Sequence, residues 1–180
     1  MCQFFSAIIV KDNILYNKHN DQHENLIENH NLDDSTLEPN FVRVELIPPN
    51  GNNYFEKDLN KWIFNVDQDL IPKWFDKKVA AAQTRATLKS FYNEIIFEDK
   101  KDLVFKNNKR VFLKNSSAIL CDRSSAKLWD RSSATLHDES SAELWDGSLA
   151  ILHNKSSAIL HNGSSATLRN GSSTILWDNS

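Results

Sequence analysis

Cys2 is the residue of this sequence with the clearest nucleophilic potential. Loss of Met1 would expose an N-terminal cysteine whose own α-amine, with a pKa of about 8, can act as its base. The alternative is structural, because a cysteine at the start of a strand also serves as a small apolar side chain. The sequence leaves both roles open.

Two histidines lie four residues apart in the segment HNDQHE, with Glu24 directly after the second. If this segment were helical, His19 and His23 would share one face and could bind zinc. The inverted zincin motif would need glutamate at the position of Gln22. A helix start rich in polar side chains explains the same residues. His19 and His23 are therefore candidate metal ligands, and His23 is also a candidate catalytic residue.

Aspartates gather in the segment DQDLIPKWFD. Asp67 and Asp69 are spaced as paired carboxylates, or as part of a divalent-ion loop, would be. Aspartates are also common as turn residues and helix caps, and Asp76 lies where a cap is expected. Upstream, Arg43 and Glu45 alternate with apolar residues. This alternation predicts the solvent side of a strand, although such a face can line a cleft.

The elements that would position these side chains belong to residues 1–100, whose irregular pattern is typical of a globular domain. The patterns predict, in order, strands at 4–10 and 14–17, a helix at 21–30, strands at 41–47 and 61–66, and a helix at 76–95. We expect a small α+β domain in which two helices pack on a sheet of four strands.

Residues 114–180 follow a different pattern, an octad of the form Asp/Asn-x-Ser-Ser-Ala-x-Leu-x. Residues 101–113 are expected to form a transition and a degenerate leading repeat, with Phe112 at the leucine position. Eight residues make about 2.2 helical turns, so successive leucines would not share a helix face. Because eight is even, the same octad position always faces the same way in an extended chain, and the period predicts β-structure.

Two β architectures have this period. An antiparallel meander would place leucines and serines on the same face, and it would put charged residues at turn positions with positive φ, which suit them poorly. Those residues are Arg123, Arg131, Glu139 and Lys155. A parallel β-solenoid would instead turn the first serine, the alanine and the leucine of every octad inward together. The all-β solenoid is favoured, with two octads in each 16-residue coil.

The same spacing places an aromatic ladder on the outside of the solenoid. Its members are Trp129, Trp145, His161 and Trp177. Exposed tryptophans in register are typical of a binding strip, and stacking of the rings on one another is the alternative. Lys127 and Glu143, also sixteen residues apart, should form an opposite-charge pair on adjacent coils.

Composition and net charge limit the classes of binding partner that the sequence favours. The chain has 180 residues, 40% of them hydrophobic, and a formal net charge of −3, which favours neither nucleic acid nor an acidic membrane surface. The two cysteines lie far apart, and the longest apolar run near the start is too short for a signal peptide or a membrane span. A cytoplasmic protein without a cofactor is expected.

Three N-terminal segments, MCQFFSAII, FVRVELIPP and WIFNVDQD, precede repeats such as DRSSAKLWDRSSATLHDESSAELW. Together they resemble uncharacterised phage and bacterial proteins that carry octapeptide arrays behind a small N-terminal α+β domain. The octads also resemble, more distantly, those of bacterial ice-nucleation proteins, but their outward positions are charged, bulky and irregular where that family has rows of threonine. The first resemblance implies no activity. For a phage protein, the expected compartment is the host cytoplasm.

The sequence favours an interaction protein over an enzyme. Its rigid solenoid would present a surface to another protein, in a phage–host or defence contact. The alternative is a small hydrolase or transferase with its site at Cys2 or the His/Asp cluster and a solenoid that only scaffolds it. The last coil, near Trp177, should expose an unpaired strand edge, which predicts end-to-end pairing of two copies, fraying, or a truncated chain. Pairing is favoured.

Overall fold

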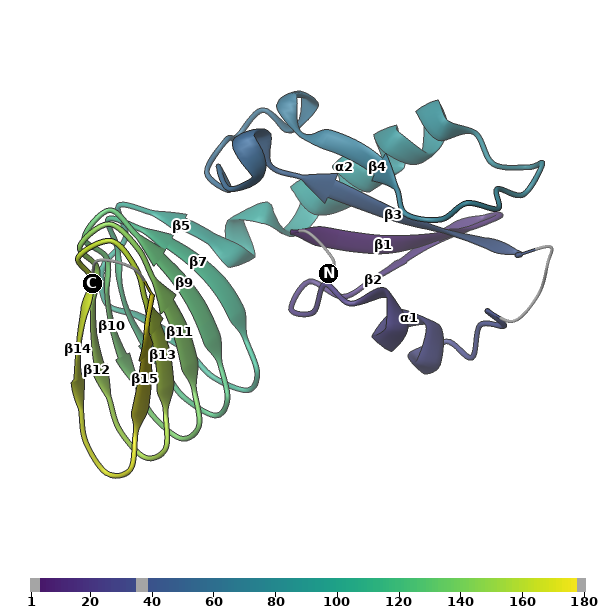
Figure 1. Cartoon of the computed structure of the whole chain (residues 1–180). Helices are drawn as coiled ribbons and strands as arrows, with labels where there is room; N and C mark the ends of the chain where they lie inside the picture. The colour runs from purple at the N-terminus through teal and green to yellow at the C-terminus, as the bar shows by residue number, and fades with distance from the viewer. Residues whose placement is uncertain (1–3, 35–38, 178–180) are drawn as a thin grey trace. The chain divides into compact units, whose positions relative to one another are not determined.

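The chain folds into two units, residues 1–93 and residues 94–180, in the computed structural model. The structure describes residues 4–34 and 39–177 (Figure 1). The first unit is α+β and the second is a parallel β-solenoid of about five coils, which confirms the predicted fold class. No helix within the described ranges is both long enough and apolar enough to cross a membrane.

A four-stranded antiparallel sheet forms the centre of the first unit, with the strand order β2-β1-β3-β4. Its strands are β1 (Phe5–Val10), β2 (Asn13–Tyr16), β3 (Phe41–Ile47) and β4 (Ile63–Val66). Two 3-10 turns, η1 (Pro49–Gly51) and η2 (Leu59–Lys61), lie between β3 and β4. The four predicted strands are therefore confirmed.

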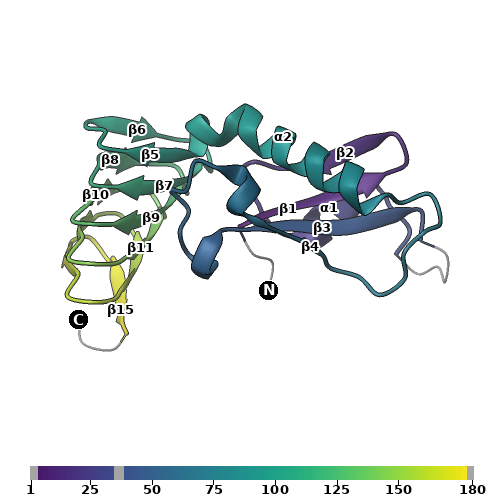
Figure 2. The same cartoon turned by 90° about the horizontal axis from the view of Figure 1, so that it is seen from above.

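Two helices cover opposite faces of this sheet: α1 (His23–Asn29) and α2 (Lys77–Ile95). Leu26 of α1 packs against Ile8 and Phe41. Phe91 of α2 lies against Phe5, with ring centroids 5.4 Å apart. Residues of opposite parity in a strand face opposite sides, so Ile8 and Phe5 of β1 belong to different faces. Figure 2 shows α2 in front of the strands and α1 behind them.

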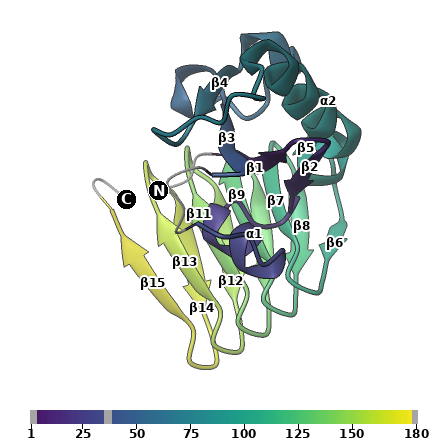
Figure 3. The same ribbon diagram turned by 90° about the vertical axis from the view of Figure 1, so that its right-hand side faces the viewer.

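Two parallel sheets form the walls of the solenoid (Figure 3). The six-stranded sheet contains β5 (Ile96–Glu98), β7 (Arg110–Lys114), β9 (Ser125–Trp129), β11 (Ser141–Leu144), β13 (Ser157–Leu160) and β15 (Ser173–Leu176). The five-stranded sheet contains β6 (Leu103–Phe105), β8 (Ser117–Leu120), β10 (Ser133–Leu136), β12 (Leu149–Leu152) and β14 (Ser165–Leu168). From β8 onward, paired strands are sixteen residues apart, which confirms two octads per coil.

The first serine, the alanine and the leucine of the octads point into the solenoid, as predicted. Leu128, Leu136 and Leu144 are completely buried, and they supply most of the apolar surface that holds the coils together. The inward serines lie at the corners. The Oγ of Ser132 donates a hydrogen bond to the carbonyl oxygen of Trp129 at 2.6 Å. This internal bond offsets the cost of burying the hydroxyl.

The leading coil departs from the predicted register by one residue. Leu113, not Phe112, aligns with Leu128 in the inward row, at a separation of fifteen residues instead of sixteen. The corner at Asn115 has a single positive φ, 45°, where each regular corner has two. This corner is therefore one residue shorter than the others. Counting back in octads placed Phe112 at the leucine position, and that prediction was wrong.

At four regular corners the second residue with positive φ is charged and longer than aspartate. The φ angles are 60° at Arg123, 62° at Arg131, 61° at Glu139 and 63° at Lys155. At the Arg131 corner, the N–H of Ser132 donates to the carbonyl oxygen of Trp129 at 3.1 Å, and the N–H of Arg131 donates to the carbonyl oxygen of Asp146 on the next coil at 3.2 Å. Their poor fit to positive φ counted against the meander, but the solenoid holds the same residues at positive φ. Bonds within and between coils hold the backbone in this conformation.

Candidate functional site

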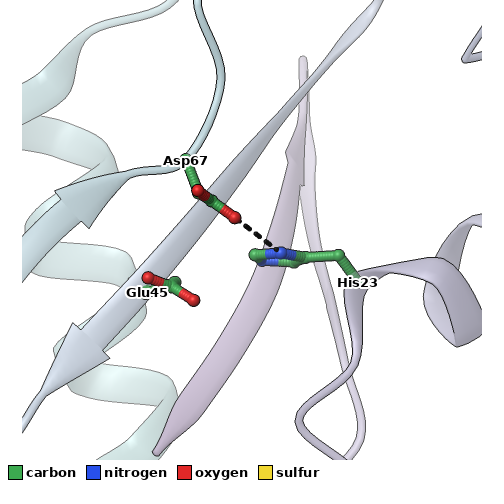
Figure 4. Close-up of side chains that lie close together, drawn as sticks. All are labelled: His23, Glu45 and Asp67. Carbon is green, nitrogen blue, oxygen red and sulfur yellow. Dashed lines mark ion pairs between the residues drawn. The ribbon is translucent and has the colours of Figure 1, made fainter. Parts of the chain in front are cut away.

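Three side chains from three elements of the first unit meet on one face of the sheet (Figure 4). They are His23, the first residue of α1, Glu45 in β3, and Asp67, directly after β4. One potential ligand atom of each lies within 4.8 Å of the other two. His23 and Glu45 are 1% and 4% exposed, whereas the Asp67 side chain is 51% exposed. The cluster is therefore buried at His23 and Glu45 and is open to solvent at Asp67.

The sheet register brings Glu45 and Asp67 to the same face. Glu45 lies opposite Asn65 of β4, and the backbone N–H of Asp67 donates to the carbonyl oxygen of Arg43 at 2.9 Å. Because residues opposite one another share a face, all four side chains lie on the same side of the sheet. The side-chain amide of Asn65 also donates to the Glu45 carboxylate at 3.3 Å.

Glu45 was predicted to lie on the solvent side of its strand, and that prediction was wrong. The face that carries Glu45 also carries Phe41, against which Leu26 of α1 packs. Glu45 is buried on this helix-covered face and not in water. Alternation along a strand identifies its two faces but does not show which of them a helix will cover.

The two ring nitrogens of His23 have different neighbours. Nε2 lies 3.1 Å from the carbonyl oxygen of Val44. Because a carbonyl oxygen only accepts hydrogen bonds, we assign a proton to Nε2. Nδ1 faces the Oδ2 atom of Asp67 at 3.4 Å. In that tautomer Nδ1 offers a lone pair toward a carboxylate oxygen, an arrangement that a metal ion bound between the two atoms would stabilise.

The other candidates from the sequence lie elsewhere. His19 is in a turn before α1, so residues 19–23 do not form one helical face. Asp69 is exposed in the loop after β4. Asp76 caps α2, as predicted: its Oδ1 accepts from the backbone N–H groups of Lys78 and Val79 at 2.8 and 3.1 Å. Cys2 lies outside the described residues.

The aromatic ladder runs along the six-stranded sheet. The rings of Trp145 and His161 are stacked, with centroids 3.7 Å apart and planes 6° apart. Trp129 is stacked on Phe112 at 6.3 Å, and Trp177 lies 6.2 Å from His161. The central pair fits the interpretation in which stacked rings stabilise the solenoid. Binding of a partner by the ladder stays a prediction.

The outer faces of the two sheets differ in charge. On the six-stranded sheet, Lys127 Nζ and Glu143 Oε2 form the predicted ion pair between adjacent coils at 2.8 Å. The six-stranded sheet also lines a groove, of about 350 Å³, and the five-stranded sheet lines a larger, shallow groove of about 880 Å³. The central row of this groove is Val104, Ile119, Thr135, Ile151 and Thr167. Val104, Ile119 and Ile151 are 56%, 41% and 41% exposed, and the neighbouring Leu149 is 54% exposed.

Sequence reasoning missed this groove, which we call the apolar face. The signal was present as isoleucine or threonine at the sixth octad position of alternate octads. No protein-family model matches the chain, and comparisons with curated proteins and with solved structures gave no match either.

Proposed function

We propose that the protein is a non-enzymatic scaffold whose solenoid binds another protein through the apolar face. The observation that carries this proposal is the exposed row of Val104, Ile119 and Ile151, with Leu149 beside it. Exposed apolar side chains gathered on one face are unfavourable in water and are typical of contact surfaces on folded proteins. The row sits on a hydrogen-bonded sheet, so little conformational entropy is lost on binding.

The chemistry of the apolar face favours one class of partner. Asp102 is the one ionisable residue among the described residues that line the groove. Nucleic acid and acidic lipid would find no basic side chain there to attract their phosphates. A protein with an uncharged apolar strip complements the face. The resemblance to phage and bacterial octapeptide-repeat proteins supplies the setting that we propose, a phage–host or defence contact in the cytoplasm.

Paired lysine substitutions test this proposal. Ile119→Lys with Ile151→Lys places two charges in the contact, and Ile159→Lys places one at the same octad position on the six-stranded sheet as the matched control. Each variant and the wild type serve as bait in a quantitative pull-down from the organism that encodes the chain, after circular dichroism confirms the fold.

We expect a protein that binds the wild type and Ile159→Lys alike, and that binds the paired variant roughly tenfold less or weaker, because burying an unpaired charge is costly. Retention of every captured protein by the paired variant would contradict the proposal. Failure of the wild type to capture any protein would contradict it as well.

Pairing of two copies through the C-terminal coil is a second proposal. β14 and β15 are the outer strands of the two sheets in the described part of the chain, and exposed strand edges favour pairing. Sedimentation equilibrium tests this on the wild type and on Leu176→Lys. We expect a dimer that dissociates in the variant, and a wild type that stays monomeric at every concentration would exclude it.

The enzymatic alternative is favoured by one observation, the meeting of His23 and Asp67 in a buried cluster of the first unit. A hydrolase or transferase site there would lose its activity in His23→Gln. Cys2→Ala tests the nucleophile separately, and full biological effect in that variant would count against Cys2.

A further inference from the structure

We propose that His23, Glu45 and Asp67 bind one divalent transition-metal ion. The site lies wholly within the first unit, so it does not depend on the proposed function of the solenoid. Its physical basis is the donor set, the spacing of the donor atoms and the orientation of the His23 ring.

The donor set is one imidazole nitrogen with two carboxylates. Zinc, manganese and ferrous iron all accept mixed nitrogen and oxygen ligands of this kind. In a tetrahedral site with bonds of about 2.1 Å, neighbouring ligand atoms are about 3.4 Å apart. The Nδ1 atom of His23 and the Oδ2 atom of Asp67 are 3.4 Å apart. The spacing of these two atoms is therefore that of two ligands on one ion, and Glu45 lies close enough to join them.

The orientation of the His23 ring is the one that metal-bound histidines require. Metal-ligating histidines usually donate their other ring N–H to a backbone carbonyl or a carboxylate, which fixes the tautomer. Here Nε2 lies 3.1 Å from the carbonyl oxygen of Val44. Nδ1 consequently carries the lone pair, and it is the atom that faces Asp67.

A second observation comes from β1. Ser6 lies opposite Glu45 in the sheet register and so belongs to the same face. The Oγ atom of Ser6 is buried and has no hydrogen-bond partner within the described residues. A buried hydroxyl without a partner is costly and calls for an explanation. A water molecule bound to the metal is the kind of partner that this hydroxyl lacks.

The arrangement corresponds to an open site and not a closed structural one. Three protein ligands leave at least one coordination position for water or substrate. The half-exposed Asp67 side chain provides a route from solvent. The nearest positive side chain on the same strand face, Arg43, pairs with Asp34 and lies 5.5 Å from the centre of the Phe41 ring, so its guanidinium is directed to other groups.

The test is a titration of the full, tag-free chain with ZnCl₂ and with MnCl₂ by isothermal calorimetry. The titration is run at a pH of about 7.5, because metal binding needs a neutral imidazole. Glu45→Gln and Asp67→Asn each remove one ligand charge while keeping the shape of the side chain. Asp69→Asn is the matched control, because Asp69 is exposed two residues from Asp67. A second control, His153→Gln, removes one of two stacked imidazoles on the solenoid, whose centroids are 4.8 Å apart.

We expect saturable binding of one ion per chain with at least one of the two salts. Glu45→Gln and Asp67→Asn should each weaken binding by roughly tenfold or more, and Asp69→Asn should leave it within about twofold. Added metal should also raise the Tm of the wild type but not that of Glu45→Gln, because a ligand that binds only the folded state stabilises it. Absence of saturable binding by the wild type would overturn the proposal. So would a site that survives both ligand substitutions or is lost in His153→Gln. Asp67→Asn keeps the test decisive if the buried Glu45 variant does not fold.

Discussion

Replacing a charged corner residue by glycine should stabilise the solenoid. Lys155 and Arg131 have φ angles of 63° and 62°, and neither side chain forms an ion pair within the described part of the chain. The left-handed conformation costs a residue with a Cβ about 1–2 kcal/mol, and glycine loses about 0.5–1 kcal/mol more entropy on folding. The difference predicts that Lys155→Gly and Arg131→Gly each raise the free energy of unfolding by about 0.5–1 kcal/mol. The two corners are on different coils, so the double variant should gain about the sum.

The reverse substitution can be made at Gly163, which occupies the same corner position as Lys155 and has a φ of 71°. A Cβ added to Gly163 would meet no atom within 4 Å. The effect of Gly163→Ala is therefore purely conformational, and the variant should lose about 0.5–1 kcal/mol of stability. Opposite signs at two equivalent corners would identify backbone conformation as the cause.

Urea unfolding measures these changes, with hydrogen exchange of the β9–β13 amides as a local readout, because repeat proteins need not unfold as one unit. Loss of stability in Lys155→Gly, or a neutral Gly163→Ala, would refute the reasoning. Either result would mean that the side chains at the corners contribute more than the backbone strain costs.

Three further predictions concern the solenoid. Leu136→Ala should lower the free energy of unfolding by about 2–5 kcal/mol, because it leaves a cavity in the core, whereas the outward Thr135→Ala should change it by less than about 0.5 kcal/mol. Urea unfolding measures both variants, and equal losses of stability would contradict the inward register of Leu136. Trp145→Ala should lower stability by about 1–3 kcal/mol because it removes the stacking partner of His161, and unchanged thermal unfolding would show that the ladder contributes nothing to the fold. Burial raises the pKa of the Cys121 thiol, so less thiolate is present at neutral pH. Alkylation of Cys121, followed by peptide mass spectrometry, should therefore be slower than alkylation of a free thiol, and faster alkylation would contradict this.

The period of the repeats was sufficient to predict the solenoid because the octads repeat the same inward serine, alanine and leucine, with Thr174 replacing the alanine in the last of them. Of the two β architectures with this period, only the parallel solenoid buries these three octad positions together and leaves the polar positions outside. The same logic failed at the leading coil, where the short corner at Asn115 shifts Phe112 out of the inward row. A change of one residue in a corner leaves no trace in composition, but it reverses which face each preceding side chain occupies.

The His23, Glu45 and Asp67 cluster was predictable only in part. The sequence singled out His23 and Asp67 separately, and it assigned Glu45 to the solvent side. Their meeting depends on two facts of tertiary structure: α1 begins at His23 and packs on the Glu45 face, and β4 pairs with β3 so that Asp67 lies beside Arg43. Neither the docking of a helix nor the order of strands is encoded in a local pattern.

The sixteen-residue coil also constrains how a gene for this protein can change in length. A loss or gain of sixteen codons removes or adds one coil and leaves every later residue on its own sheet. A change of eight codons would transfer every later octad to the opposite wall, so that the row containing Lys127 and Glu143 would continue into the row of the apolar face. Only a change by a whole number of coils therefore keeps each outer row of side chains on its own sheet.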